Sequence, residues 1–267
     1  MVLRGASAEA QAGLRSKVDA SPAGDLATIG EDLFGASAVL RAEPGLRRVA
    51  TDQSLDASAK SDLVRGVFDG KLSASGLDLV ADAVSRRWTT PRDLADTLEN
   101  LGVVATVKSA GSDSARLADE LFEISQLVNE NADLRGALSE PTRSVADKGA
   151  LLSGLLEGKA LAATQRLAVL ALNGSHRTVT VALGEYQKIA AAVKDESVAK
   201  VRVARELSAA DRDRLQNALS AQYGRPVHLN VSVEPDLVGG LRVEIGDDVI
   251  DGSVSSRIDD ARRRLAG

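Results

Sequence analysis

The side chains that most often carry catalysis are scarce in this sequence of 267 residues. It contains no cysteine, which excludes disulfides, thiolate nucleophiles and iron–sulfur clusters. His176 has no clustered ligands near it in the sequence, and His228 falls on the polar side of a predicted strand, so we interpret both as surface or boundary residues. Because no Ser/His/Asp set and no paired-carboxylate motif stands out, we predict no catalytic residue, no metal site and no cofactor.

One segment, 66–72, looks at first like a phosphate-binding loop. It has three residues between its glycines instead of four, and Leu72 stands where a serine or threonine would hold magnesium. The segment 154–160 departs from the motif in the same two ways. We therefore predict that Gly70 and Gly158 end helices in the left-handed conformation, without binding a nucleotide.

Composition indicates which elements must position any functional residues. Apolar residues make up 44% of the chain but aromatic residues only 2%, so Leu, Val and Ala must build the core, which favours helices. The net charge of −5 argues against general nucleic-acid binding. No apolar run approaches 18 residues, and residues 1–20 lack the pattern of a secretory signal, so we expect neither a membrane span nor a signal peptide.

Residues 1–190 read as helices with short breaks at 43–45, 90–91, 110–111 and 140–141, and they contain an internal repeat. Segment 31–98 aligns with segment 119–186 at a shift of 88 residues, without gaps and with about one position in five identical. Turn glycines as well as apolar positions match, which a shared helical pattern alone does not explain. We predict two tandem helical bundles, 1–110 and 111–194.

The pattern changes near residue 196, where strands begin. Alternating apolar residues predict strands around 201–203, 227–233 and 241–245, with a return strand at 249–250. Ser208 followed by Asp211 predicts a capped helix between the first two strands, and Ser253 a cap for a last helix. The fold class is thus mainly α, with two tandem helical bundles followed by a small α+β domain, 195–267.

The sequence leaves two interpretations open for each of two further features. Trp88 is a core or groove-lining residue of the first bundle, or a partner contact, because tryptophan is enriched at interface hot spots. The run 262–264, three arginines in the last predicted helical turn, is a solvated face, or a contact for an acidic partner or an anionic lipid.

The stretch 231–258 closely resembles the signature of the delta subunit of F-type ATP synthase, the family of the oligomycin-sensitivity-conferring protein. Its Gly-Gly pair and its Asp-Gly-Ser element occur in the family's order and spacing. Weaker matches make 119–190 similar to the family's N-terminal six-helix bundle, and 1–105 similar to a second version of it, whereas the usual member has one. A duplicated bundle resembles actinobacterial members. The family-signature residues are Asp236, Gly239, Gly240, Asp251, Gly252, Ser253 and Arg257.

These signature residues have a structural and a functional interpretation. Glycine at 239 and 240 would allow positive φ or a bulge, Gly252 would supply a turn, and Ser253 would cap the last helix. They would then shape the fold without touching a partner. Arg257, on the first turn of the last predicted helix, is the better candidate for a stalk contact.

The resemblance implies a tether without catalytic residues. The bundle is implied to take the N-terminal helices of alpha subunits into an apolar groove, and the C-terminal domain to hold the end of the b-subunit coiled coil. Duplication would give a second groove or a longer spacer. The implied location is peripheral, on the cytoplasmic side of the cell membrane, and proton-driven ATP synthesis the implied process.

Two other classes of function remain open at this stage. One is a helical-bundle adaptor unrelated to ATP synthase, which would make the signature a coincidence. The other is an RNA-binding protein, which would need a basic sheet that bears aromatic residues. Strands within 227–245 have neither an aromatic residue nor clustered lysines, so we expect no nucleic-acid partner.

Overall fold

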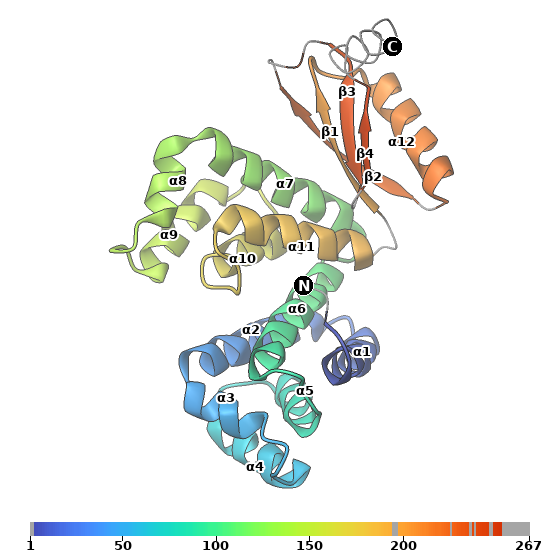
Figure 1. Cartoon of the computed structure of the whole chain (residues 1–267). Helices are drawn as coiled ribbons and strands as arrows, with labels where there is room; N and C mark the ends of the chain where they lie inside the picture. The colour runs from blue at the N-terminus through green and yellow to red at the C-terminus, as the bar shows by residue number, and fades with distance from the viewer. Residues whose placement is uncertain are drawn as a thin grey trace, which may run out of the picture. The chain divides into compact units, whose positions relative to one another are not determined.

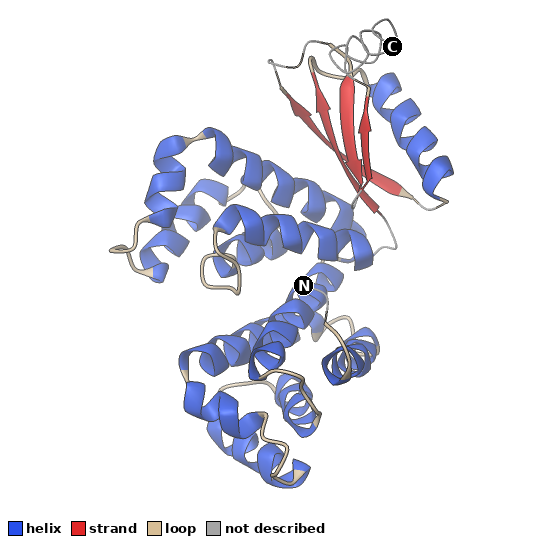
Figure 2. Ribbon diagram, viewed as in Figure 1, coloured by secondary structure: helices blue, strands red, loops and turns tan. Residues whose placement is uncertain are grey.

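The computed structural model describes residues 3–193, 197–224, 226–234, 237, 239–245 and 248–252 (Figure 1). Contacts divide the chain into two compact units, residues 1–190 and 191–267. The prediction of a mainly helical chain with a small sheet at its C-terminal end is confirmed (Figure 2). The predicted division at 110/111 falls inside the first unit and stays a prediction.

Helices build the first unit. Their bounds are α1 Ala6–Asp19, α2 Leu26–Ala42, α3 Pro44–Ala50, α4 Ala57–Phe68, α5 Ala74–Ser85, α6 Pro91–Ser109, the 3₁₀ turn η1 Gly111–Asp113, α7 Ser114–Glu130, α8 Ala132–Ser139, α9 Val145–Leu156, α10 Ala162–Leu170 and α11 Val179–Val193. The breaks predicted at residues 43–45, 90–91, 110–111 and 140–141 coincide with helix ends.

The repeat is visible in the helix ends themselves. Adding 88 to the bounds of α2 gives those of α7, and adding 88 to the bounds of α4 gives those of α9. The same shift carries the first residue of α5 onto that of α10, and the first residue of α6 onto that of α11. The two copies therefore share their backbone plan although most of their side chains differ.

Helix α6 belongs to both copies. It contacts α1, α2, α3 and α5 of the first copy, and α7 and α10 of the second. A surface helix normally leaves one face in water, but α6 is buried almost all round, at Leu94, Ala95, Thr97, Leu98, Glu99, Leu101, Gly102, Val103, Val104, Ala105, Thr106 and Val107. The segment 119–190, which resembles a six-helix bundle, contains helices only from α7 to α11, and α6 supplies the missing helix.

The second unit is a mixed sheet covered by one helix. Its elements are β1 Ser197–Val203, α12 Ala209–Tyr223, β2 Val227–Val233, β3 Leu241–Ile245 and β4 Asp248–Asp251. The strand order is β2-β1-β3-β4, with β1 and β2 parallel and the other neighbours antiparallel. Ser208 accepts a hydrogen bond from the N–H of Asp211 at 3.1 Å, which confirms the predicted cap of α12.

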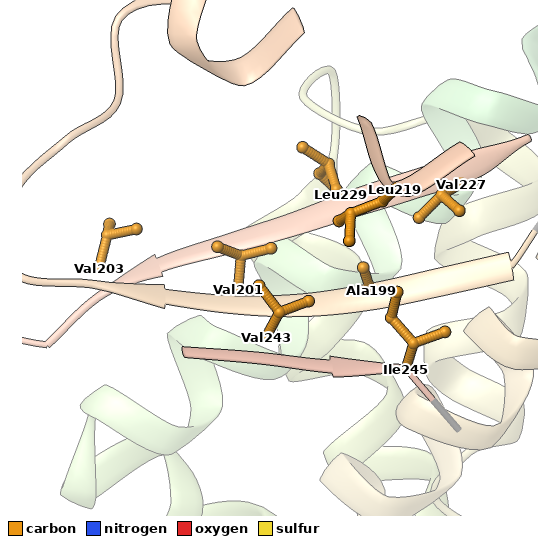
Figure 3. Close-up of a cluster of buried hydrophobic side chains, with 8 residues drawn as sticks. All are labelled: Ala199, Val201, Val203, Leu219, Val227, Leu229, Val243 and Ile245. Carbon is orange, nitrogen blue, oxygen red and sulfur yellow. The ribbon is translucent and has the colours of Figure 1, made fainter. Parts of the chain in front are cut away.

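The core of this unit lies between the sheet and α12. Alternate residues of β1, β2 and β3 point toward Leu219 of α12 (Figure 3): Ala199, Val201, Val203, Val227, Leu229, Val243 and Ile245. The period-2 pattern that predicted these strands is therefore the pattern of burial against one helix. The predicted last helix, with the cap at Ser253 and the arginines 262–264, lies outside the described residues.

Candidate partner-binding sites

The signature residues that the structure describes meet at one end of the sheet. Gly239 and Gly240 immediately precede β3, while Asp251 ends β4 and is followed by Gly252. Because β3 and β4 are antiparallel, these two ends lie together, and the N–H of Gly252 donates to the carbonyl of Leu241 at 2.9 Å. Asp236, Ser253 and Arg257 lie outside the described residues.

Backbone geometry accounts for the signature glycines. Gly239 has φ 75° and Gly240 φ 84°, a region in which other residues are strained. The N–H of Gly239 also donates to the carbonyl of Leu237 at 2.7 Å. Gly252 does not have positive φ, but a Cβ there would lie 3.3 Å from the carbonyl oxygen of Leu241. The glycines therefore shape the entry to β3 and the exit from β4.

Charged side chains are interleaved across the strands of this sheet. Arg202 on β1 pairs with Glu244 on β3 at 3.3 Å, and Arg242 lies 3.5 Å from the same carboxylate. Asn230 on β2 is 2% exposed, yet neither amide atom has a hydrogen-bond partner in the part of the chain described. These charged side chains therefore pair with one another, while the amide of Asn230 is buried.

The loop that resembles a phosphate site is a helix end in both copies. Gly70 has φ 66° and Gly158 φ 70°, and each follows the last turn of its helix, α4 or α9. The ammonium of Lys71 donates to the carbonyl of Val67 at 2.9 Å, so it closes its own helix. The predicted left-handed helix ends are confirmed, and the lysine is engaged within the chain.

Trp88 and His176 take part in the packing of the helical unit. Trp88 is buried, and its indole N–H donates to the carbonyl of Ala83 at 2.9 Å, which supports its interpretation as a core residue. His176 is half-buried, and its ring lies edge-on to that of Tyr186 with centroids 6.1 Å apart. His228 on β2 is also half-buried.

A buried polar cluster joins the two copies at α6. The carboxylate of Glu99, which is 3% exposed, pairs with Arg41 of α2 at 2.5 Å and accepts a hydrogen bond from the hydroxyl of Tyr186 of α11 at 2.9 Å. The N–H of Ser175 donates to it at 2.9 Å. A Cβ on Gly174 would lie 2.6 Å from the carboxylate, so glycine is needed there.

The electrostatics of this cluster suit a structural contact between helices and not an acid–base pair. Burial and the adjacent Glu99 carboxylate raise the pKa of the Tyr186 hydroxyl well above its usual range, so the tyrosine stays neutral and donates. Arg41 also pairs with Asp96 at 2.8 Å. The cluster thus links α2, α6 and α11 across the shared helix. No sequence pattern predicted this cluster, because the three positions have no common motif.

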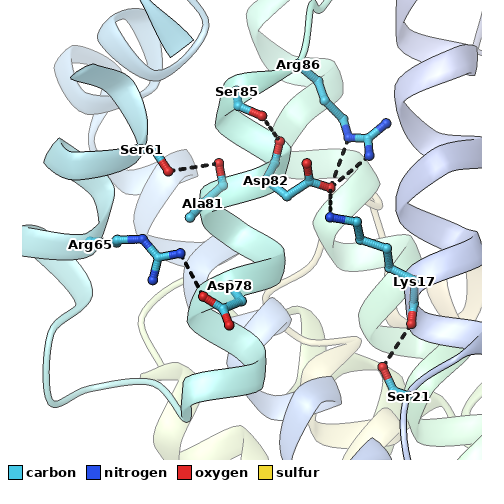
Figure 4. Close-up of polar contacts among 9 residues, drawn as sticks. All are labelled: Lys17, Ser21, Ser61, Arg65, Asp78, Ala81, Asp82, Ser85 and Arg86. Atoms are coloured by element: carbon cyan, nitrogen blue, oxygen red, sulfur yellow. Dashed lines mark hydrogen bonds and ion pairs between the residues drawn. The ribbon is translucent and has the colours of Figure 1, made fainter. Parts of the chain in front are cut away.

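The seam between α1 and α5 carries ion pairs (Figure 4). Lys17 of α1 reaches Asp82 of α5 at 3.1 Å, and Arg86 reaches the same carboxylate at 2.8 Å. Burial opposes the ionisation of Asp82, but hydrogen bonds from Arg86 and Lys17 outweigh it, and the pKa of this carboxyl is lowered. The Arg86 guanidinium lies over Gly13, where any side chain would collide with it.

One carboxylate in each copy caps the start of a helix. Asp32 of α2 accepts from the N–H of Ser73, the residue directly before α5, at 3.0 Å. Glu120 of α7, 88 residues later, accepts from the N–H of Leu161, the residue directly before α10, at 2.9 Å, and from the hydroxyl of Thr164 at 2.6 Å. Acidic residues at equivalent repeat positions were the available sequence signal for this pair.

Two other kinds of site are not found among the described residues. Nowhere among them do three or more His, Asp or Glu side chains gather in a way that could hold a metal ion. No helix within the described part of the chain is long and apolar enough to cross a membrane.

Comparisons with known proteins agree with one another. Residues 104–265 match the model of the family described as ATP synthase delta (OSCP) subunit, and this match begins inside α6. The chain is 59% identical to the ATP synthase subunit delta of a Nocardioides species over 99% of this chain and 98% of that protein. It is 38% identical to the protein of the same name from Streptomyces coelicolor over 99% and 98%. It is 42% identical to the protein of the same name from Kineococcus radiotolerans, over 91% of this chain and 89% of that protein.

Proposed function

Since the chain belongs to the ATP synthase delta (OSCP) subunit family and is a non-catalytic component of that enzyme's stalk, we propose that it ties the catalytic head to the stalk. The head must be held while the rotor turns inside it, so the tether works mechanically. The alternative of a helical adaptor unrelated to ATP synthase is wrong, because similarity to delta subunits covers 99% of the chain.

The observation that carries this proposal is the division into two compact units of different architecture. A tether needs two ends that recognise different partners. The helical unit offers helix faces for the N-terminal helices of alpha subunits, by helix-in-groove recognition. The sheet unit offers an interleaved polar surface and the glycine-shaped ends of β3 and β4 for the end of the b-subunit coiled coil.

The shared helix supports a mechanical role for the duplicated bundle. Because α6 serves both copies and Glu99 fastens α2 to α11, one copy cannot rotate against the other without breaking a buried charge cluster. Duplication then lengthens the helical end of the tether without adding a hinge at α6. It also offers a second place for an alpha helix.

Location follows from the same assignment. A subunit of the ATP synthase associates with the membrane through the complex, and we infer that this chain does so peripherally, on the cytoplasmic side of the cell membrane. Proton flow through the complex would then affect this chain only through the mechanical force that the complex exerts on it.

A pull-down from intact membranes at low salt tests the two-ended tether. We would use the tagged full chain and the same chain cut between the two units, as 1–193 and 194–267. We expect the full chain to recover both alpha and b, the first fragment alpha only, and the second fragment b only. Recovery of both subunits by one fragment would contradict the assignment of one partner to each end.

A further inference from the structure

One asparagine of this sequence stands directly before a glycine, at Asn173–Gly174. The pair lies in the irregular loop between α10 and α11, and the side chain of Asn173 is exposed. The other asparagines lie in a helix or a strand or directly before a helix, and none of them precedes a glycine: Asn100, Asn129, Asn131, Asn217 and Asn230. The fold thus places the single Asn-Gly pair where water reaches it.

The glycine of this pair has a structural cause. Its φ lies outside the positive region, so backbone conformation does not require it. A Cβ on Gly174 would lie 2.6 Å from a carboxylate oxygen of Glu99 and 3.0 Å from the hydroxyl oxygen of Tyr186. A larger residue would therefore push apart the buried cluster that joins α2, α6 and α11.

The asparagine has no such cause. Its side-chain amide has no hydrogen-bond partner in the part of the chain that the structure describes. Its backbone N–H donates to the carbonyl of Leu170 at 3.1 Å, a contact that does not depend on the side chain. The amide of Asn173 is therefore free to turn toward the main chain that follows it.

The backbone nitrogen of Gly174 is also free. The N–H groups on either side of it are held, because Asn173 donates to Leu170 and Ser175 donates to Glu99 at 2.9 Å. The N–H of Gly174 donates to no acceptor among the described residues. Glycine also has no side chain to shield its nitrogen. An unengaged nucleophile therefore stands next to an unengaged amide.

We propose that Asn173–Gly174 is a site of spontaneous covalent modification, at which the asparagine is converted to aspartate and isoaspartate. The nitrogen of Gly174 attacks Cγ of Asn173 and forms a succinimide ring. The bond from Cγ to Nδ2 breaks, and ammonia leaves with the proton of the former N–H. Water then adds to either carbonyl of the ring and opens it. Asparagine is among the thermally labile residues for this reason, and the products carry a new negative charge.

Isoaspartate loosens the cluster at Glu99. Its main chain runs through the former side chain and is one carbon longer, directly before Gly174 and Ser175. The extra atom moves the N–H of Ser175 away from the carboxylate of Glu99, which is 3% exposed. A buried acceptor that loses a donor destabilises the fold. The reaction needs only residues of this chain and water, so it does not depend on the proposed tether function.

Peptide mapping of the full-length chain tests the reaction. The purified chain is aged in warm, mildly alkaline buffer, and mass spectrometry of digests measures the mass gain from exchange of NH₂ for OH at each asparagine. We expect Asn173 to convert at least about tenfold faster than Asn131, a barrier difference of about 1.4 kcal/mol. Asn131 is the matched control because its side chain is engaged, accepting from the N–H of Leu134 at 3.0 Å. Conversion of Asn173 no faster than that of Asn131 would overturn the proposal.

Isoaspartate and aspartate have the same mass, so a second measurement distinguishes them. An isoaspartyl methyltransferase with a labelled methyl donor should label the aged chain in the peptide that contains Asn173. Asn173→Gln keeps a neutral amide but adds a carbon to the ring that must close, so this variant should stay unlabelled there. Label of equal amount in the aged Asn173→Gln chain would place the reaction elsewhere.

Thermal unfolding measures the consequence for the helical unit. We expect the midpoint of the modified chain to fall by about 2–4 °C, and that of the aged Asn173→Gln chain to stay unchanged. Equal losses in both aged chains would contradict the link to Glu99. Fresh Asn173→Asp, which has the charge without the longer main chain, should unfold like the unchanged chain. A fresh Asn173→Asp chain that already shows the full loss would overturn the account by main-chain lengthening.

Discussion

The two copies of the helical repeat keep the same helix ends but use different side-chain chemistry at equivalent places. The first copy bridges the seam between α1 and α5 with Lys17, Asp82 and Arg86. At the same positions 88 residues later, the second copy has Ala105, Leu170 and Gly174. A duplicated bundle thus retains its backbone plan while one seam turns from ionic to apolar.

Contacting positions have changed together. Asp32 in the first copy faces Gly76, whose missing side chain leaves room for the carboxylate. Glu120 in the second copy is longer by one carbon and faces Thr164, which donates a hydrogen bond to it. The capping function is the same, but each partner has been replaced to suit the other. Comparing the two copies therefore distinguishes features that the backbone requires from side-chain pairs that can be replaced together.

The largest expected effect is at the residue that makes the copies one body. Glu99→Ala would leave Arg41 and Tyr186 without their shared acceptor in a buried place. We expect the free energy of unfolding of the helical unit to fall by about 3–5 kcal/mol, the usual cost of breaking a buried ion pair. Urea unfolding followed by circular dichroism measures it, with the exposed Glu123→Ala as control. Equal losses in both variants would mean that the cluster does not fasten the copies.

A second expected effect concerns how closely the long helices cross. In the first copy α2 and α6 cross at Gly30 and Gly102, where a Cβ on Gly102 would lie 3.0 Å from the ring of Phe34 and 3.1 Å from the carbonyl of Gly30. The second copy has Ala118 and Ala190 at these positions. Gly102→Ala should cost about 1–3 kcal/mol through overpacking.

The reverse substitution in the second copy provides the comparison for this helix crossing. Ala190→Gly should cost about 1 kcal/mol, because glycine is the poorer helix former. Thermal unfolding of both variants gives the comparison. Stabilisation by Gly102→Ala would contradict overpacking and show that the crossing of α2 and α6 can accommodate a Cβ.

The capping carboxylates should contribute equally despite their different lengths. Asp32→Ala and Glu120→Ala each remove the acceptor for the backbone N–H of the residue directly before a helix, α5 or α10. We expect each to lower the free energy of unfolding by about 1–2 kcal/mol. Urea midpoints of the two variants measure this. A loss in one copy only would mean that the other helix start is satisfied in some other way.

The smallest expected effect is a dependence on pH that only the first copy carries through its ionic seam. The pKa of Asp82 in the folded chain is lowered from 3.8, so its contribution to stability is complete above that value and is lost as pH falls through the folded pKa. Asp82→Asn should therefore cost less than about 1 kcal/mol at neutral pH, and nothing in strong acid.

Urea midpoints of the unchanged chain and of Asp82→Asn, measured from neutral pH to about pH 2, test this seam. Their difference should shrink as the pH is lowered. A difference that stays constant to the acid end would mean that Asp82 acts through packing and not through its charge.

The sequence predicted most of the local structure because the signals were local. Helix breaks at prolines and glycines, the cap at Ser208, and the alternation in β1, β2 and β3 each depend on a few neighbouring residues. The repeat at 88 residues was equally visible, since it needs only the chain compared with itself. For the same reason Gly70 and Gly158 were recognised as helix ends.

The functional surface was less predictable. Sequence singled out seven signature residues. For the glycines among those described, the structure gives backbone reasons, and their role as a stalk contact stays a prediction.

The sequence by itself determined the helices, the strands and the duplication, since hydrophobic period, turn residues and caps act over a few positions. Only the tertiary structure decided that α6 serves both copies, that Glu99, Arg41 and Tyr186 meet, and that Asp32 and Glu120 cap helices far along the chain. These contacts join residues 41 to 87 positions apart. Their partners are chosen by packing geometry, which no local pattern encodes.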